Sequence, residues 1–196
     1  MMLEAEQLRL SWTGAKKIHL TSRAGTDLTA DLGVVEPFIE CGFANQPGGE
    51  AAFSDGEVSL GVKEGTAQGV VVIDGPAAYI GQPATPLELT FESGRLTDIS
   101  GDMRTGRALR DIIEKVKDAD NFAEIGIGVN PACRKLGVFQ EEKKAYGTVH
   151  IALGRNCGVY GGTVAAQIHM DMVFYDGTVT TDKGILLRDG RLAFNE

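Results

Sequence analysis

The sequence lacks several features that would place it in a specialised class of protein. No apolar run is long enough to span a membrane, and the N-terminal MMLEAEQLRL lacks the basic-then-apolar order of a secretory signal. The three cysteines, Cys41, Cys133 and Cys157, are odd in number and widely spaced, so they indicate neither a disulfide framework nor a CxxC zinc site. These absences favour a cytoplasmic protein in a reducing compartment.

Positive charge is also scarce. The 196 residues include 19 Lys and Arg against 27 Asp and Glu, which gives a formal net charge of −8. Nucleic acids and anionic membranes are bound through clustered basic side chains that neutralise phosphate. We therefore expect neither a nucleic acid nor a membrane as a partner. The composition, 43% apolar and 23% charged, is that of an ordinary globular protein.

The pattern of residues predicts an α+β fold that is rich in β-structure. Glycine-containing turns separate short runs of Val, Ile, Leu and Thr, such as GVVVIDG and LELTFESG, and the C-terminal MVFYDGTVTTDKGILLRDGRLAF is typical of hairpins. One segment, residues 105–117, is predicted to be a helix because Leu109, Ile112, Ile113 and Val116 form one apolar stripe. We expect a single, mainly antiparallel domain over residues 1–196, with one or a few helices.

Four residues of metal-ligand type lie in apolar, strand-like runs. Glu124 lies in FAEIGIG, His150 in GTVHIALG, and His169 and Asp171 in IHMDM. In a strand, His169 and Asp171 point to the same face. A single such residue is more often a hydrogen-bonded core residue, but for four together a site for Zn²⁺, Mn²⁺, Co²⁺ or Fe²⁺ is as good an interpretation as four separate structural residues. The run EEKKAY, residues 141–146, is expected to be a solvated turn; the alternative is that Lys143 or Lys144 orients a substrate carboxylate.

Several longer segments resemble a known family of enzymes. GTDLTADLG, NQPGGEAAF, AEIGIGVNPACRKLGVFQEEKKAYGTVHIALG and IHMDM occur in this order. They are similar to segments of the thermophilic-type metallo-aminopeptidases, the aminopeptidase T and aminopeptidase S family (M29). The likeness extends from about residue 16 to the end of the chain. It implies the C-terminal, metal-binding domain of a larger, dimeric, two-domain enzyme whose N-terminal domain this chain does not contain.

The resemblance also implies roles for individual residues. Glu124, His150, His169 and Asp171 match metal ligands, and Glu50 would be a further ligand or the base that activates the attacking water. The family has two adjacent glutamates where this chain has Gly49 and Glu50. The family has a tyrosine at about the position of Cys157, and Tyr160, three residues later, is the candidate to act in its place.

Three hypotheses about function follow. The first is a metal-dependent hydrolase, with Zn, Co or Mn, that cleaves a small peptide or amide substrate through a metal-activated water. The second is a non-catalytic descendant of the peptidase domain that binds a ligand or a protein partner. The third is a mononuclear non-haem iron dioxygenase, because His150, His169 and Asp171 have the composition of a two-His-one-carboxylate triad. We favour the hydrolase and expect a homodimer; metal analysis would separate the three.

Overall fold

The computed structural model describes residues 1–33, 35–44, 47–49 and 51–193, which form two antiparallel sheets. The strands of the larger sheet, in spatial order, are β13 (Arg191–Leu192), β12 (Gly184–Arg188), β11 (Gly177–Thr181), β1 (Lys17–Ser22), β2 (Asp27–Asp31), β5 (Gln68–Ile73), β6 (Leu87–Glu92) and β7 (Arg95–Gly101). Those of the smaller sheet are β10 (His169–Phe174), β9 (Val149–Gly154), β8 (Phe122–Gly128), β4 (Glu57–Gly61) and β3 (Phe38–Glu40).

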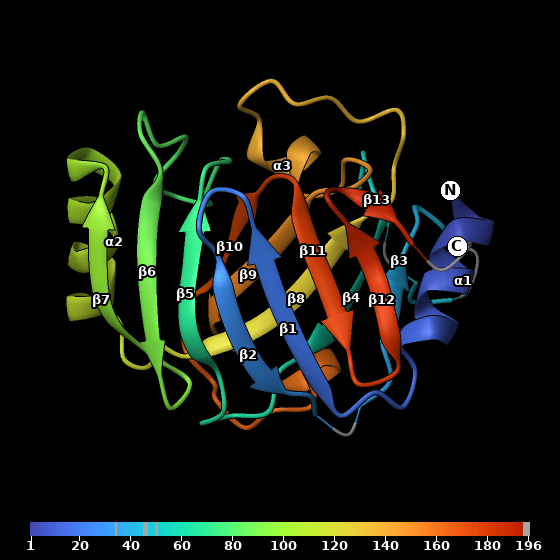
Figure 1. Ribbon diagram of the computed structural model, residues 1–196, viewed down its shortest axis with the longest axis horizontal. Helices are drawn as coiled ribbons and strands as arrows, with labels where there is room; N and C mark the ends of the chain where they lie inside the picture. Colours follow the sequence, from blue (N-terminus) through green and yellow to red (C-terminus); the bar gives the residue numbers. More distant parts are fainter. Residues whose placement is uncertain (34, 45–46, 50, 194–196) are drawn as a thin grey trace.

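The two sheets are stacked face to face, with the smaller sheet behind the larger one in Figure 1. One hydrophobic cluster joins their inner faces, and it includes Leu20 and Leu89 from the larger sheet and Ile125 and Ile151 from the smaller one. All pairs of neighbouring strands are antiparallel. The predicted α+β, mainly antiparallel fold is therefore confirmed.

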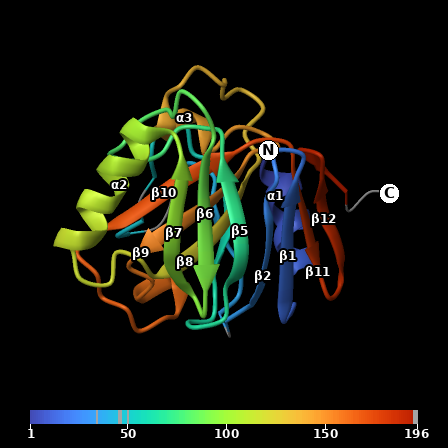
Figure 2. The ribbon, with the colours of Figure 1, turned by 60° about the vertical axis from the view of Figure 1, so that its left-hand side comes forward.

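Helices lie at the two ends of the stacked sheets (Figures 1 and 2). Helix α1 (Met2–Trp12) buries Leu8 and Trp12 against the strands at one end. Helix α2 (Met103–Lys115) packs beside β7 at the other end, and the Asp102 carboxylate caps it by accepting a hydrogen bond of 2.8 Å from the Thr105 N–H. A short helix, α3 (Phe139–Glu142), and a 3-10 turn, η1 (Gly158–Tyr160), lie in the connections around the smaller sheet.

The apolar stripe predicted for residues 105–117 belongs to helix α2. Leu109 is fully buried, and Ile112 and Ile113 pack partly buried against the core. The helix begins two residues earlier than predicted and ends at Lys115, because Val116 already has an extended backbone. No helix in the described part of the chain is long and apolar enough to cross a membrane.

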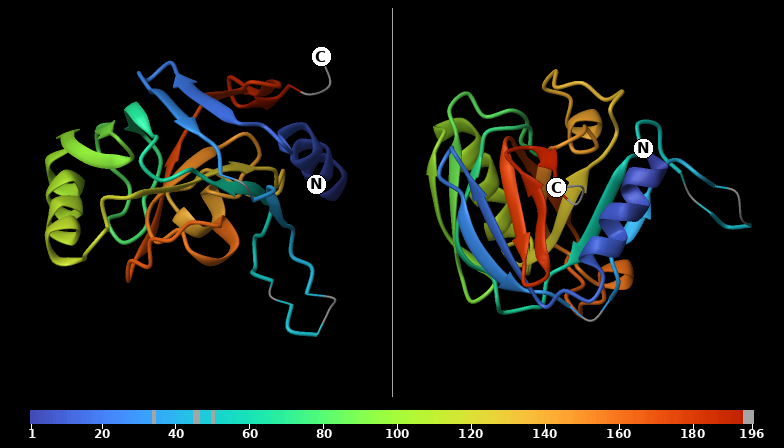
Figure 3. Two further views of the ribbon diagram at one scale, coloured as in Figure 1. Left: turned by 90° about the horizontal axis from the view of Figure 1, so that it is seen from below. Right: turned by 45° about the vertical axis from the view of Figure 1, so that its right-hand side comes forward.

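The prediction of a continuous series of hairpins at the C-terminus is wrong at its first turn. Strand β10 belongs to the smaller sheet and β11 to the larger one, so the turn at Asp176 carries the chain from one sheet to the other. Asp176 has a left-handed backbone (φ 49°), which permits this sharp change of direction. The two later turns do close hairpins, β11–β12 and β12–β13. Figure 3 shows the described part of the β3–β4 connection extending away from both sheets.

Candidate metal centre

Three adjacent strands of the smaller sheet, β8, β9 and β10, carry the four ligands predicted from their strand contexts on the same face. Asp171 of β10 lies opposite Ala152 of β9, which lies opposite Glu124 of β8. Directly opposed residues of an antiparallel sheet point the same way, and so do residues two apart in one strand. His150, His169 and Asp171 therefore share one face with Glu124.

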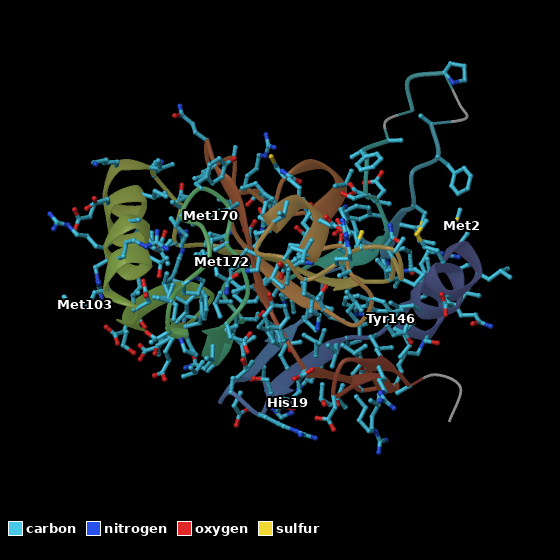
Figure 4. The ribbon with its side chains drawn as sticks, turned by 90° about the horizontal axis from the view of Figure 1, so that it is seen from above. Met2, His19, Met103, Tyr146, Met170 and Met172 are labelled. Atoms are coloured by element: carbon cyan, nitrogen blue, oxygen red, sulfur yellow. The ribbon has the colours of Figure 1, made fainter. Side chains whose placement is uncertain are left out.

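The opposite face of the same strands is apolar and belongs to the core. Met170 and Met172 alternate with His169 and Asp171 along β10, and both methionines are fully buried. Figure 4 places these two methionines in the interior of the molecule and His19 on its outside. His19, the third histidine, pairs with Asp27 at 2.7 Å on β1 and β2, in the other sheet.

Small residues on the polar face make room for the large ligands. A Cβ atom at Gly126 would lie 2.2 Å from ring atoms of His150, and one at Gly61 would lie 2.1 Å from the backbone oxygen of Tyr160. Neither separation is compatible with van der Waals packing. The alternation of glycine with bulky apolar residues in these strands therefore serves the site as well as the sheet.

His169 is held with one ring nitrogen facing two carboxylates. Its Nδ1 lies 2.7 Å from the Arg155 carbonyl oxygen, which can only accept, so Nδ1 donates. Its Nε2 lies 2.8 Å from Glu124 Oε2 and 3.0 Å from Asp171 Oδ1. In the neutral ring, Nε2 would present a lone pair to both carboxylates. A proton or a metal cation must therefore lie between Nε2 and the two carboxylate oxygens. Metal-binding histidines are commonly oriented in this way, by a hydrogen bond from the other ring nitrogen to a backbone oxygen.

His150 completes a second cluster deeper in the sheet. Its side chain is fully buried, and neither ring nitrogen has a hydrogen-bond partner among the described residues. Its Nε2 lies 3.5 Å from Glu57 Oε2 and 3.7 Å from Glu124 Oε1, and these two oxygens are also unpaired. Atoms that bind one metal at about 2.1 Å are separated by such distances. Glu124 joins the two clusters by contributing one oxygen to each.

Two consecutive lysines approach the carboxylates from the end of α3. Lys143 Nζ lies 2.9 Å from Asp171 Oδ2 and 3.6 Å from Glu57 Oε1. Lys144 Nζ lies 2.8 Å from Glu57 Oε1, and it also pairs with Glu40 and Asp55. The expectation of a solvated turn for residues 141–146 is therefore wrong, because Lys144 is only 4% exposed and Glu142 is fully buried.

The cluster holds more negative than positive charge. Its buried or nearly buried ionic groups are the carboxylates and ammonium groups of Asp55, Glu57, Glu124, Asp171, Lys143 and Lys144. Four carboxylates against two ammonium groups leave two negative charges, which one divalent cation would neutralise. Buried charge that is not compensated is expensive, so this excess favours a cation at the centre.

The pKa values of the two histidines reflect the same excess. Burial alone would lower the pKa of His169, but hydrogen bonds to Asp171 and Glu124 outweigh it and raise the pKa to about 10. Burial also opposes the charged form of His150, yet the negative charge of Glu57 and the Glu124 carboxylate raise its pKa. Burial raises the pKa of Glu57. In the absence of a metal, protons thus take the place of the missing positive charge.

The structure brings together Glu124, His150, His169 and Asp171, the four residues predicted as ligands from their strand contexts. It does not place His150 in one ligand group with His169 and Asp171, so the predicted triad is divided between two clusters that share Glu124. Glu50 lies outside the described residues. That these residues bind metal stays a prediction.

Tyr160, predicted as a catalytic residue, stacks on the imidazole of His169, with ring centroids 5.0 Å apart and planes 10° from parallel. Burial, followed by the nearby charges of Glu124 and Asp171, raises the pKa of its phenol, which stays protonated. The contact places Tyr160 beside a candidate ligand, while its catalytic role stays a prediction.

Glu57 is the candidate ligand that the sequence analysis missed. It begins EVSLG, in which Glu57, Ser59 and Gly61 alternate with Val58 and Leu60. The strands of Glu124 and His150 show the same alternation of polar or small with bulky apolar residues. This shared alternation could have indicated Glu57 as a ligand. EVSLG was overlooked because it lies far along the chain from the segments that contain the other ligands.

A pocket of about 380 Å³ opens onto the first cluster. His169 and Asp171 form part of its wall, and the remaining lining residues are Ala78, Tyr79, Phe139, Gln140 and Lys143. Two hollows of about 570 and 610 Å³ lie elsewhere, and neither is lined by any of the clustered histidines. A small molecule in the 380 Å³ pocket would contact His169 and Asp171 directly, and the volume of this pocket lies within the usual range for ligand sites.

The fold and the cluster of histidines and carboxylates define a protein with a candidate metal centre, and comparison with known proteins gives its family. The family model described as NicX, 2,5-dihydroxypyridine 5,6-dioxygenase, matches residues 3–194. The chain belongs to this family. A 2,5-dihydroxypyridine 5,6-dioxygenase of Pseudomonas putida is 26% identical over 193 residues, which cover 88% of this chain and 53% of that protein. The chain thus spans about half the length of this curated relative.

Two solved structures have the same fold. The 2,5-dihydroxypyridine dioxygenase of Pseudomonas putida KT2440 has a TM-score of 0.87 at 21% identity, over 97% of this chain and 58% of that chain. Wild-type AmpT from Thermus thermophilus has a TM-score of 0.69 at 20% identity, over 98% of this chain and 53% of that one. At these identities the likenesses show the fold alone.

The identification of the chain as an M29 aminopeptidase is therefore wrong. The family model that matches nearly the whole chain belongs to the dioxygenases, which also overturns the preferred function of a peptidase or amide hydrolase. The two families share a fold, and much of the quoted likeness lies in strands β2, β8, β9 and β10 of that fold. Such strand segments indicated the fold correctly but did not distinguish the chemistry. The third hypothesis, a dioxygenase, fits the comparisons better.

Proposed function

We propose that the chain carries the metal-binding part of a ring-opening dioxygenase that acts on a hydroxylated pyridine. The observation that carries this proposal is the match of residues 3–194 to the dioxygenase family. The small substrate that we expected is then a planar heteroaromatic ring instead of a peptide or amide. The expected homodimer stays a prediction.

We infer that Fe²⁺ is held by Glu124, His169 and Asp171, the cluster next to the 380 Å³ pocket. Non-haem iron oxygenases bind iron through imidazole and carboxylate, usually two His and one carboxylate, and this cluster offers the same ligand types as one His and two carboxylates. When bound, the iron would supply a Lewis-acidic, redox-active centre for the reaction of dioxygen with the ring, and the electrons that reduce the oxygen would come from the ring itself. His150, whose Nε2 lies 3.7 Å from Glu124 Oε1, would position the deeper oxygen of the shared Glu124 carboxylate.

The protein residues around this cluster would orient the ligands and limit access of water. The Arg155 carbonyl fixes the ring of His169, and Lys143 fixes Asp171 by donating to its outer oxygen. Tyr160 covers one face of the imidazole. These contacts leave Asp171 Oδ1 directed at His169 Nε2, 3.0 Å away, and a cation would lie between these two atoms.

The direct test is anaerobic loading with Fe²⁺ followed by addition of 2,5-dihydroxypyridine and oxygen. We expect one iron per site, stoichiometric oxygen uptake and loss of the ultraviolet absorption of the ring. His169→Ala and Asp171→Ala should each lower iron affinity by more than about 100-fold, whereas His19→Ala, on the other sheet, should retain iron and activity. A wild-type chain that holds iron but consumes no oxygen with this substrate would contradict the proposal.

A further inference from the structure

Lys143 and Lys144 are neighbours in sequence but differ in their surroundings. Lys144 is 4% exposed and is surrounded by three carboxylates, those of Glu40, Asp55 and Glu57. Lys143 donates a single hydrogen bond within the described residues, to Asp171, and its side chain lines the 380 Å³ pocket. An ammonium group has three N–H donors, so Lys143 has donors available to a bound molecule.

The pocket around Lys143 has aromatic side chains on its walls. The ring centroid of Phe139 lies 6.0 Å from Lys143 Nζ. Tyr79 lines the same pocket and is 76% exposed. Flat aromatic walls bind planar rings through stacked or edge contacts, which a flexible aliphatic molecule cannot match.

Tyr79 is held at the pocket by a tight turn in a strained conformation. Its φ angle is 64°, which is unfavourable for a bulky aromatic residue. The turn is fixed by paired hydrogen bonds between Ala77 and Gly81, and the Ala78 N–H donates to the backbone oxygen of Asp171 at 2.9 Å. An exposed aromatic residue that keeps a strained backbone beside a candidate ligand indicates a functional position.

We propose that Lys143 selects the substrate by binding an ionised oxygen substituent of a planar ring, with Phe139 and Tyr79 beside the ring. This inference rests on the proposed function and specifies its substrate class: an aromatic ring that carries an anionic oxygen. A neutral ring would leave the N–H groups of Lys143 that do not donate to Asp171 covered by the ring without an acceptor on it, which is unfavourable. An anionic oxygen accepts a charge-assisted hydrogen bond there while the ring lies next to His169 and Asp171.

The test measures ring binding to the iron-loaded protein under argon, by isothermal titration calorimetry. Three probes are used: 2,5-dihydroxypyridine above the pKa of its hydroxyl group, pyridine-3-carboxylate, and neutral pyridine. The variants are Lys143→Met and Lys143→Arg, with Lys117→Met, an exposed lysine, as the matched control. Iron content and circular dichroism are measured first for each variant, and Lys143→Gln replaces Lys143→Met if that variant does not fold.

We expect Lys143→Met to weaken binding of the ionised hydroxypyridine about 10–100-fold and that of pyridine less than about twofold. Lys143→Arg should recover most of the affinity, and Lys117→Met should behave as wild type. Weakening of the carboxylate probe alone, equal weakening of charged and neutral rings, or no weakening would overturn the inference. Oxygen uptake separates the two proposals. If the wild-type chain consumes oxygen but ring binding does not depend on Lys143, only this inference is wrong. If the chain consumes no oxygen but ring binding depends on Lys143, only the proposed reaction is wrong.

Discussion

Gly126 determines whether the imidazole of His150 can occupy its position. The absence of a side chain leaves the space that this ring fills, since a Cβ would lie 2.2 Å from it. We expect Gly126→Ala to displace the ring, to destabilise the fold by about 1–3 kcal/mol through overpacking, and to weaken metal binding. The measurements are urea denaturation and metal titration.

Gly106 in helix α2 provides the contrast to Gly126. A Cβ there would lie 3.3 Å from Leu87 and 3.4 Å from Ile99, at the ends of their side chains. Alanine also has the higher helix propensity, so Gly106→Ala should stay within about 1 kcal/mol of the wild type and retain metal. If both variants behaved alike, the proposed steric role of Gly126 would be wrong.

His169 should make the stability of the metal-free protein depend on pH. Its pKa is raised from 6.5 to about 10, so its charged form stabilises the fold fully below pH 6.5, and this stabilisation is lost as the pH rises through about 10. We expect the Tm of the metal-free protein to fall across this interval. His169→Gln should flatten that part of the profile, as should metal loading, because a metal ligand carries no proton at Nε2. If the Tm of the metal-free wild type did not change with pH over this interval, the raised pKa of His169 would be wrong.

Whether a site residue could be predicted from the sequence depended on how much it differs from its immediate neighbours. Glu124, His150, His169 and Asp171 stood out because each interrupts an apolar strand, and the structure brings all four together. Glu57 did not stand out, since EVSLG follows a turn and has no companion ligand nearby in the sequence. The positions of the lysines depended on how a long connection folds back over the sheet, which no local pattern encodes.

At the scale of elements, the sequence predicted whether a segment is a helix or a strand better than it predicted which strands pair in one sheet. Apolar residues that alternate with polar ones predict strands, and apolar residues that recur about every 3.6 positions predict helix α2. Both patterns follow from backbone geometry. The sheet to which β10 or β11 belongs depends instead on the packing of distant strands. The N-terminal helix α1 was not predicted; its Leu8 and Trp12 are buried, but exposed Leu3 and Leu10 blur the amphipathic pattern.

The turn that carries Tyr79 supports a prediction at this scale. Tyr79→Gly should relieve the left-handed backbone and leave the Tm equal to or a few degrees above that of the wild type, while weakening binding of 2,5-dihydroxypyridine several-fold. Ser93→Gly is the matched control, since Ser93 also has a positive φ of 49° but lies in the β6–β7 turn. It should gain stability without changing the affinity. A marked loss of Tm in Tyr79→Gly would instead mean that the tyrosine is needed for packing.

For the whole molecule, the excess of buried negative charge links metal binding to folding. Four strands that are distant in sequence each contribute a carboxylate or imidazole to the centre, so a cation there stabilises the smaller sheet as a unit. The unfolded chain cannot hold these groups together. Metal binding should therefore add to the free energy of unfolding by mass action.

The size of this increase in the free energy of unfolding follows from the linkage between metal binding and folding. At free Fe²⁺ about 100 times its Kd, binding adds about 2.7 kcal/mol. For a chain of this size that raises the Tm by roughly 5–11 °C. The measurement is anaerobic differential scanning calorimetry with and without Fe²⁺, followed by a chelator, which should restore the lower Tm. Asp171→Asn should reduce the increase, since it removes one negative ligand but preserves the shape of the side chain. An increase of the same size in His169→Ala would show that the metal stabilises the protein from another site, and the cluster would then need a different explanation for its unpaired oxygens.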